Sequence, residues 1–329
     1  MPHPPRVGTL AQIGEFGFLA QLLPKLWRGA GVIIGPGDDC ALVETRNSRF
    51  LVTTDVLIED VHFRRGWLTP RQIGRRGFCV TASDLAAMGG RPRFVFVSVA
   101  APPSTTVADL RRLHEGIAAA ARENGASIAG GNLSRGRALF VSLTMIGDSP
   151  PRPLQRSGAR PGDALYVTGD LGTAALGRQL LQGGRSGSAI QRFRQPIPRL
   201  AVGALLARRR IASAAIDVSD GLLQDLHHLC VASGVGARID ASMIPCTRPV
   251  RARGLALALS GGEDYELLYT VPPPRLASME RLKRRLGCRI TRIGQILPAR
   301  AGICVVDATG APVSLRHQGF DHFAGDKRR

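Results

Sequence analysis

Residues 69–90, TPRQIGRRGFCVTASDLAAMGG, have the pattern of a helix buried between the layers of an α/β fold. Thr69 is a favourable N-cap, Pro70 stands at the first helical position, and the closing glycine pair ends the apolar pattern. The runs FLVTT (50–54) and FVFVSVA (94–100) are rich in β-branched and aromatic residues and predict a strand on either side. A strand, a helix and a strand in this order indicate mixed α/β layers.

One residue of this helix does not suit its apolar face. Asp84 falls on the same helical face as Ile73 and Val80, which is small or apolar. A carboxylate on a buried face is costly unless it is paired or bound to a metal. Asp84 is therefore either a core residue paired with one of the many arginines or a metal ligand.

Strand and helix patterns continue to alternate along the rest of the chain. Its 329 residues suit about two domains, and a loop-rich stretch beginning SPPRP at 149–153 separates two halves. The expected fold class is α/β (α+β), with one mixed α/β domain in residues 1–148 and a second in residues 149–329. No run of about 20 apolar residues occurs, so we expect no membrane span.

The charge of the chain points first to anionic partners. It carries 44 basic and 25 acidic residues, a formal charge of +19, which would suit nucleic acid. Only three of the basic residues are lysines, the arginines are scattered, and no basic stripe is interleaved with aromatic residues that could stack on bases. We therefore expect no nucleic-acid partner. A protein that binds RNA or DNA is the alternative, and it would show steeply salt-dependent binding.

The cysteines and the N-terminus both suit a protein of the cytoplasm. None of the six cysteines forms a C-x-x-C pair, so neither a zinc knuckle nor a redox motif is expected. Reduced, buried thiols fit better. The first residues, MPHPPR, have no apolar signal core behind them and do not resemble an export signal.

The acidic residues are concentrated in a few places. Twelve of the 25 fall in five short segments at strand ends or in glycine-rich turns: Asp38–Asp39, Asp55/Glu59/Asp60, Asp84, Asp217/Asp220/Asp225 and Glu263/Asp264/Glu266. Loops of this kind carry binding groups on a rigid scaffold. Carboxylates without a neighbouring His or Cys cluster are the ligand set of Mg²⁺, which usually accompanies a polyphosphate substrate.

Two of these segments also have simpler interpretations. The Asp38–Asp39 pair in GPGDD could be an exposed turn. The pair Ser219–Asp220 before an apolar helical run could be an ordinary helix N-cap.

A polyphosphate would need hydrogen-bond donors as well as metal ions. The glycines of GGN (130–132) and of GDLG (169–172), the latter opening a helix, offer backbone N–H groups. Arg135 and Arg156 offer charge-assisted contacts. The chain has neither a P-loop nor the protein-kinase motifs, so a phosphate site here would be of another kind.

Seven motifs together resemble the thiamine-monophosphate kinase family, in the family's order and across residues 14–323. They are GPGDDCA (35–41), TD with VHF (54–63), SDLAAMG (83–89), GGN (130–132), IDVSDGL (216–222), SGGEDYEL (260–267) and GFDHF (319–323). The wider superfamily includes the aminoimidazole ribonucleotide synthetase and selenophosphate synthetase folds. The resemblance implies two domains, an N-terminal one for ATP, Mg²⁺ and dimerisation and a C-terminal one that completes the site.

The resemblance also implies a role for each residue that matches a family motif. Mg²⁺ would be held by Asp39, Thr53, Thr54, Asp55, Asp84, Asp217 and Asp220, with Asn132 as a further ligand. ATP would be contacted by Gly131, Asn132, Arg156 and Ser219. The thiamine phosphate would be contacted by His62, Glu263 and Phe320. The implied partners are ATP, thiamine monophosphate and a second copy of the chain in a homodimer.

The chain departs from the family pattern at three positions. Asn132 stands where many members have Asp, which removes one negative charge. Asp60 stands where Gly is common, and Phe320 replaces a Tyr or Trp. The first two departures leave the number of bound ions open. Phe320 could instead be a hydrophobic anchor, and His62 a structural histidine.

The implied reaction is ATP-dependent conversion of thiamine monophosphate to thiamine diphosphate, in thiamine diphosphate biosynthesis. The nucleophile is a phosphate oxygen that is already anionic, since the second pKa of a phosphate monoester is about 6. No general base is then required, and several Mg²⁺ ions would allow two anions to approach for direct in-line transfer. The alternative is another ATP-using enzyme of the same superfamily with a different small substrate.

Overall fold

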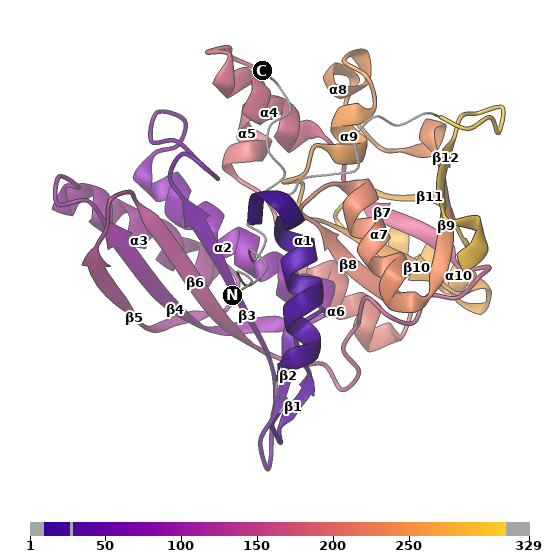
Figure 1. Cartoon of the computed structure of the whole chain (residues 1–329), viewed down its shortest axis with the longest axis horizontal. Helices are drawn as coiled ribbons and strands as arrows, with labels where there is room; N and C mark the ends of the chain where they lie inside the picture. Colours follow the sequence, from indigo (N-terminus) through magenta and orange to yellow (C-terminus); the bar gives the residue numbers. More distant parts are fainter. Residues whose placement is uncertain (1–9, 27–28, 314–329) are drawn as a thin grey trace, which may run out of the picture.

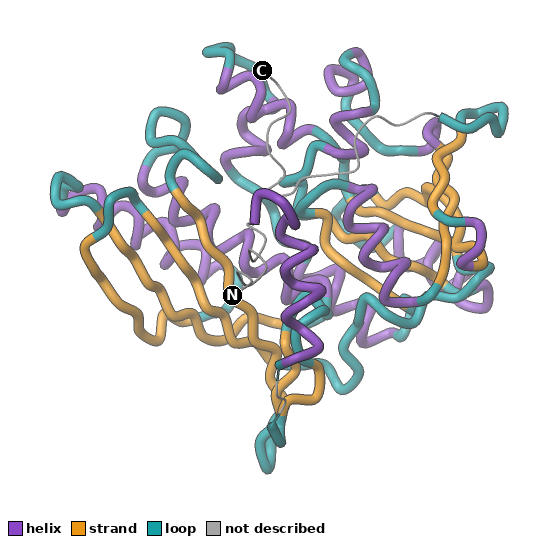
Figure 2. The backbone as a smooth tube through the Cα atoms, in the orientation of Figure 1, coloured by secondary structure: helices purple, strands orange, loops and turns teal. Residues whose placement is uncertain are grey.

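Two six-stranded sheets form the framework of the computed structural model, which describes residues 10–26 and 29–313 (Figure 1). The strand order is β1-β2-β3-β6-β4-β5 in the first sheet and β12-β9-β11-β7-β10-β8 in the second. Figure 2 shows the two sets of strands well apart, with helices between and around them. The expected pair of mixed α/β domains is confirmed.

The first sheet is built from the chain up to residue 148. The elements in this part are α1 (Leu10–Leu22), β1 (Val32–Ile34), β2 (Ala41–Glu44), β3 (Arg49–Ile58), α2 (Pro70–Ala87), β4 (Arg91–Ala101), α3 (Val107–Glu123), β5 (Ser127–Arg135) and β6 (Phe140–Asp148).

The second sheet is built from the chain after residue 163. The elements in this part are β7 (Ala164–Thr168), α4 (Thr173–Gln182), α5 (Ala189–Arg194), α6 (Leu200–Arg209), β8 (Ala214–Val218), α7 (Leu222–Ser233), β9 (Val235–Asp240), α8 (Arg248–Ala252), α9 (Ala256–Ser260), β10 (Glu266–Val271), α10 (Leu276–Lys283), β11 (Ile290–Pro298) and β12 (Ile303–Val306). No helix in the described ranges combines the length and apolar character needed to cross a bilayer.

Helix α2 has the start that its sequence predicts. The Thr69 side chain accepts a hydrogen bond from the backbone of Gln72, and the Gln72 side chain accepts one from the backbone of Thr69. This reciprocal capping satisfies backbone donors that have no partner inside the helix. The helix lies almost wholly buried against β3, β4 and β6.

Only one face of the first sheet is covered by its own helices. α2 pairs with α3, and the core of this half lies between them and the inward side chains of the sheet. The opposite face carries Phe94, Phe96 and Phe140, which are 36–43% exposed. Strands β4 and β6 thus present apolar rings. In Figure 1 no helix of the described residues covers this face of the sheet.

The second sheet is covered on both faces, and α2 extends onto one of them. α4, α7 and α9 pack on one face, whereas α6 and α10 pack on the other. Ala86 and Ala87 at the end of α2 join the core beneath α6. At Gly203 in α6, a Cβ atom would lie 1.8 Å from the carbonyl oxygen of Ala86, so only glycine allows this approach. Helix α2 therefore fixes the two halves against each other.

The structure corrects two expectations in the first half. Asp55 does not end its strand, because β3 continues to Ile58 and pairs with β6 along its whole length. The GGN segment at 130–132 is part of strand β5 and not a glycine turn. The glycine serves strand packing here, since a Cβ at Gly131 would lie 1.9 Å from the carbonyl oxygen of Val97.

Candidate active site

Three carboxylates distant in sequence meet where α2 passes the edge of the second sheet. One oxygen from each of Asp39, Asp84 and Asp217 lies within 4.8 Å of the others. Asp39 comes from the turn before β2, Asp84 from α2, and Asp217 from β8. We call these three residues the acid cluster. It draws on both halves of the chain, and its geometry therefore depends on how α2 packs on β8.

Hydrogen bonds from neighbouring side chains orient each member of the acid cluster. Thr53 Oγ1 donates to Asp84 Oδ2 at 2.5 Å, and Ser83 Oγ donates to Asp217 Oδ2 at 2.7 Å. Arg156 Nη2 donates to Asp39 Oδ1 at 2.8 Å. Each carboxylate is thus held by one donor, and this is the only guanidinium within ion-pair distance of the cluster in the described residues.

The acid cluster is electrostatically unfavourable without a cation. Burial, and then the charge of Asp39, raises the pKa of Asp217 to about 7. Burial raises the pKa of Asp84 well above its ordinary value, and the charges of Asp217, Asp55 and Asp39 add to the shift. The pKa of Asp39 is also raised by burial, although Arg156 opposes the shift. Such shifts arise where like charges share a desolvated site.

One atom of the acid cluster has no partner in the described part of the chain. Asp39 Oδ2 is buried and accepts no hydrogen bond. A buried carboxylate oxygen of this kind is costly unless a ligand satisfies it. Three carboxylates with hydroxyl oxygens beside them fit Mg²⁺, which prefers hard oxygen ligands.

Further acids surround the acid cluster with different roles. Asp55 follows Thr53 by two residues on β3, so both side chains face α2, and its charge raises the pKa of Asp84. The charge of Asp220, after β8, raises the pKa of Asp217. Asp225 instead accepts hydrogen bonds from the backbone N–H groups of Asp220 and Gly221, and so it shapes the turn into α7.

Thr54 lies on the other side of the sheet. Its hydroxyl is exposed and forms a hydrogen bond of 3.1 Å with the hydroxyl of Thr144 on β6. Alternation along the strand explains this, because Thr53 points inward and its neighbour points outward. The structure brings the Thr53 side chain to the acid cluster and not the Thr54 side chain.

Gly131 and Asn132 also lie apart from the acid cluster within one chain. They belong to β5, and β6 and β4 separate that strand from β3. Three strand spacings amount to roughly 14 Å. Asn132 pairs with Ser98 and faces the open side of the sheet, opposite to α2.

The implied nucleotide residues Arg156 and Ser219 do lie beside the acid cluster. Arg156 carries the guanidinium that pairs with Asp39, and its backbone N–H donates to both oxygens of Asp38 at 3.3 Å. Ser219 follows β8 two residues after Asp217, and its carbonyl oxygen accepts a hydrogen bond of 2.7 Å from the N–H of Glu263. This bond ties the SGGED loop to the end of β8.

Glu263 is held in a strained loop by two arginines. Its φ angle is 64°, a conformation that residues other than glycine rarely adopt. Arg76 Nη2 donates to its Oε1 at 3.0 Å, and Arg178 Nε lies 3.6 Å from its Oε2. Arg76 is fully buried on α2 and also stacks on the rings of Phe193 and Tyr265. Arg76 and Glu263 therefore form a second contact between the two halves, in addition to the one at the acid cluster.

The other two residues implied for the thiamine phosphate are His62 and Phe320. His62 Nδ1 accepts a hydrogen bond of 3.1 Å from the N–H of Ile58, which closes the turn after β3. This bond places the proton of the neutral ring on Nε2. Phe320 lies outside the described residues.

The helix N-terminus expected to receive a phosphate already holds a carboxylate of the chain. Gly172, which caps α4, donates its N–H to Asp264 Oδ2 at 2.8 Å. Asp264 is fully enclosed, and burial raises its pKa to about 8. The prediction that the GDLG segment offers these donors to a ligand is therefore wrong, because Asp264 accepts the N–H of Gly172, and backbone carbonyl groups accept those of Gly169 and Leu171.

Two residues of the site were missed from the sequence. Arg76 sits beside Arg75, and no pattern in the sequence indicates which of the two is buried. In the structure Arg75 pairs with the exposed Glu123, whereas the buried Arg76 pairs with Glu263. Ser83 precedes Asp84, and its role depends on β8, which comes over a hundred residues later. Only the interruption of an apolar helix by a charge could have drawn attention to Arg76.

Comparisons with known proteins match both halves of the chain to related domain families. A family model described as the N-terminal domain of AIR synthase related protein matches residues 37–148, and the corresponding C-terminal domain matches residues 160–307. A thiamine-monophosphate kinase of Mycobacterium tuberculosis (strain ATCC 25618 / H37Rv) is 39% identical over 84% of this chain and 86% of its own length. The chain belongs to the thiamine-monophosphate kinase family.

Other members of the family match over nearly the whole length. The thiamine-monophosphate kinase of Escherichia coli (strain K12) is 36% identical, and the match covers 94% of this chain and 98% of the relative. The solved structure of AaThiL complexed with AMPPCP and TMP superposes with a TM-score of 0.83 at 31% identity, covering 96% of this chain and 99% of that one. The family resemblance seen in the motifs is confirmed, and the chain is a kinase.

Proposed function

We propose that the chain transfers the γ-phosphoryl group of ATP to thiamine monophosphate and so forms thiamine diphosphate. The observation that carries the proposal is the acid cluster, which three elements of both halves assemble in a member of this kinase family. A solved relative is described as complexed with AMPPCP and TMP, which supports a site for a nucleotide and a second phosphorylated ligand.

Mg²⁺ is the cation that the acid cluster would hold. Asp39, Asp84 and Asp217 would be ligands, with Asp55 and Asp220 adding charge and Thr53 adding its hydroxyl. Bound Mg²⁺ would supply the positive charge that lets two phosphates approach. Thr54 could contribute only through its backbone carbonyl, because its hydroxyl faces the other side of the sheet.

The side chains of the protein orient the reactants and need not remove a proton. A phosphate oxygen of thiamine monophosphate, already anionic near neutral pH, attacks the γ-phosphorus in line, and the bond to the β–γ bridging oxygen breaks to release ADP. Arg156 and Ser219 lie beside the acid cluster, where ATP would bind. Asp39 Oδ1 holds the Arg156 guanidinium in place, so the arginine is oriented before a phosphate arrives.

The acceptor would lie near Glu263, His62 and Phe320. Glu263 Oε1 is engaged by Arg76, but its buried Oε2 accepts no hydrogen bond in the described residues. This oxygen would attract the cationic ring of thiamine, and Arg178, whose Nε lies 3.6 Å from it, would contact the phosphate. In this arrangement Arg76 is a positioning residue, since it fixes Glu263 and is itself fully buried.

We further propose a homodimer formed through the N-terminal halves. The open face of the first sheet exposes Phe94, Phe96 and Phe140, and apolar patches of this kind mark interfaces. Asn132 lies on the same open face, away from the acid cluster of its own chain. Roles for Gly131 and Asn132 in the site would therefore require that a second copy supply them.

A reducing compartment such as the cytoplasm suits this chain. All six cysteines lie in the described ranges and all are free thiols, of which Cys40, Cys79 and Cys230 are buried. Unpaired cysteines are usual where thiols are kept reduced.

One assay tests the proposed function. The purified chain is incubated with Mg-ATP and thiamine monophosphate, and the product is identified by mass. We expect ADP and thiamine diphosphate in equal amounts, with no product from Asp217→Asn. Release of ADP only with another small acceptor would instead assign a different substrate within the same superfamily.

A further inference from the structure

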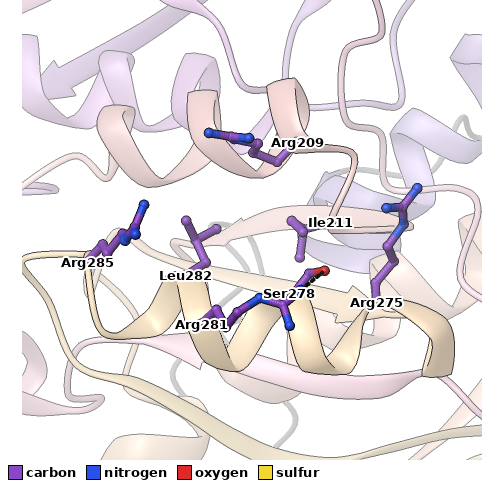
Figure 3. A pocket seen from close by; sticks show the side chains of 7 residues that line it. All are labelled: Arg209, Ile211, Arg275, Ser278, Arg281, Leu282 and Arg285. Atoms are coloured by element: carbon purple, nitrogen blue, oxygen red, sulfur yellow. Dashed lines mark hydrogen bonds between the residues drawn. The ribbon is translucent and has the colours of Figure 1, made fainter.

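A second site lies between α6 and α10, on the face of the second sheet away from α7. It is a pocket of about 320 Å³. Four arginines line it: Arg209, Arg275, Arg281 and Arg285. Its other lining residues are Ile211, Ser278 and Leu282. Figure 3 shows Arg275 and Arg285 reaching toward α6 from the two ends of the α10 side, with Ile211 and Leu282 between them.

The four guanidinium groups of the pocket form no ion pair within the described residues, in contrast to the buried or half-buried Arg76, Arg156 and Arg199. No carboxylate lies within 4 Å of any of the four pocket groups in the described ranges. Arg281 donates to Ser278 Oγ at 3.1 Å, which orients one group by a neutral partner. Glu280, the acid in α10, is engaged elsewhere by Tyr166 and Lys283. The pocket therefore gathers positive charge that the chain itself leaves uncompensated.

An anion bound among the four exposed guanidinium groups would relieve their mutual repulsion. Guanidinium groups favour phosphate and carboxylate because their planar donors match two oxygens at once. The volume lies at the small end of the range for small-molecule pockets. Ile211 and Leu282 add a short apolar floor, and no exposed aromatic side chain for base stacking lines the pocket.

The pocket is separate from the acid cluster. Ile211 precedes β8, whereas Asp217 lies near the C-terminal end of that strand. The two sites thus flank opposite ends of a five-residue strand, which spans roughly 16 Å. They share no lining residue.

We propose that this pocket binds a small anion bearing two or more phosphoryl groups, at a place distinct from the kinase site. Arg275 and Arg285 grip the anion from its two ends, and Arg209 completes the cage from α6. We infer a small occupant because the pocket holds only about 320 Å³. The site does not depend on the proposed kinase activity.

Calorimetry with inorganic pyrophosphate tests the pocket directly. The full chain is titrated at low salt with EDTA present, so that the acid cluster, without a cation, repels the anion. We expect saturable binding of one pyrophosphate per chain. The double variant Arg275→Gln/Arg285→Gln should weaken this binding at least tenfold, and its thermal unfolding and kinase rate should match those of the parent.

A matched pair controls for net charge. Arg238 and Arg300 are exposed in the same half of the chain and do not line the pocket. Arg238→Gln/Arg300→Gln removes the same charge and should change the affinity less than twofold. Equal losses in the two pairs would show diffuse attraction and overturn the proposal, as would the absence of saturable binding to the parent chain.

A single-stranded oligodeoxynucleotide serves as the competing probe. Much tighter binding of the oligonucleotide than of pyrophosphate, lost in Arg275→Gln/Arg285→Gln, would assign the surface to nucleic acid and overturn the small-anion proposal. Weak binding that is equal in both double variants supports it. A parent chain that lacks thiamine-phosphate kinase activity but still binds pyrophosphate would refute the proposed function alone.

Discussion

The acid cluster and the surroundings of Glu266 are two regions where carboxylates are buried, and they differ in what satisfies them. Glu266 is fully buried, and it accepts hydrogen bonds from Thr168 at 2.5 Å and from the guanidinium groups of Arg192 and Arg199. The acid cluster has three carboxylates and one guanidinium. The charge of Glu266 is compensated within the chain, whereas the acid cluster keeps more carboxylates than guanidinium groups.

Burial alone therefore does not distinguish a carboxylate with a structural role from one that could bind a ligand. The number of carboxylates relative to neighbouring guanidinium groups does distinguish the two roles, because an excess of negative charge in a desolvated place needs a counter-charge. The same replacement of a carboxylate by its amide should then have opposite consequences for stability in the two regions.

Loss of activity in the acid cluster is the largest expected effect. Asp84→Asn and Asp217→Asn each remove a charge that would hold Mg²⁺, and we expect turnover to fall by roughly 100-fold or more. Circular dichroism should show an unchanged fold. Activity near that of the parent in both variants would refute the assignment of the acid cluster.

The free energy of unfolding of the amide variants should differ in sign of change between the two regions. Glu266→Gln leaves the two partly buried guanidinium groups of Arg192 and Arg199 without a counter-charge and should lower the free energy of unfolding by about 3 kcal/mol. Asp217→Asn should raise it in EDTA at pH 8, because it removes repulsion. Urea unfolding measures both values, and a fall in stability for both variants would contradict the distinction.

The pH dependence of stability gives an intermediate effect. The pKa of Asp217 is about 7 in the folded chain against an ordinary 3.8, and that of Asp38 is raised to about 6, mainly by burial and then by Asp39. The folded chain therefore binds more protons than the unfolded chain between pH 5 and 8, and stability falls as the pH rises through this window. We expect this slope in EDTA and a much flatter one in saturating Mg²⁺. Identical urea midpoints at pH 5 and pH 8 in EDTA would contradict it.

A smaller effect is expected at the second interdomain contact. Glu263→Gln keeps the shape of the side chain but removes the charge facing thiamine, so KM for thiamine monophosphate should rise about tenfold, equivalent to about 1.4 kcal/mol, while KM for ATP changes little. Glu123→Gln, at an exposed pair with Arg75, is the control. A larger rise in KM for ATP would place Glu263 on the nucleotide side.

The smallest effect is expected at Asp60, which is distant from both buried regions. Its φ is 66°, and its pairing with Arg64 at 3.6 Å is solvent-exposed. Asp60→Gly should raise the free energy of unfolding by up to about 1 kcal/mol, because glycine adopts this conformation without strain. Asp60→Ala should not, and equal thermal midpoints for the two variants would show that strain is not the cause.

Much of the fold follows from local patterns in the sequence. The helix over 70–87 begins at the predicted cap, and the strands predicted at 50–54 and 94–100 lie within β3 and β4. These elements carry their own start and stop signals. Strand β5 does not, since its glycines and Asn132 resemble a turn until β4 is placed beside it.

The site could be predicted in part for the same reason. The carboxylates were found because they are scarce and fall at the ends of elements. Two of their partners, Arg76 and Ser83, were not found, because each acts through a contact with a residue that is far away in the chain. Which side of a strand a residue faces also follows from register. The hydroxyl of Thr53 reaches Asp84, whereas that of Thr54 lies on the opposite face of the sheet.

The passage of α2 from one half of the molecule onto the other has a consequence for assembly. Neither half alone contains a complete cation site, because Asp39 and Asp84 belong to one and Asp217 to the other. Any ion that favours the complete trio stabilises the docked arrangement through mass action. Bound Mg²⁺ would then add to the stability of the contact that α2 already makes between the two halves.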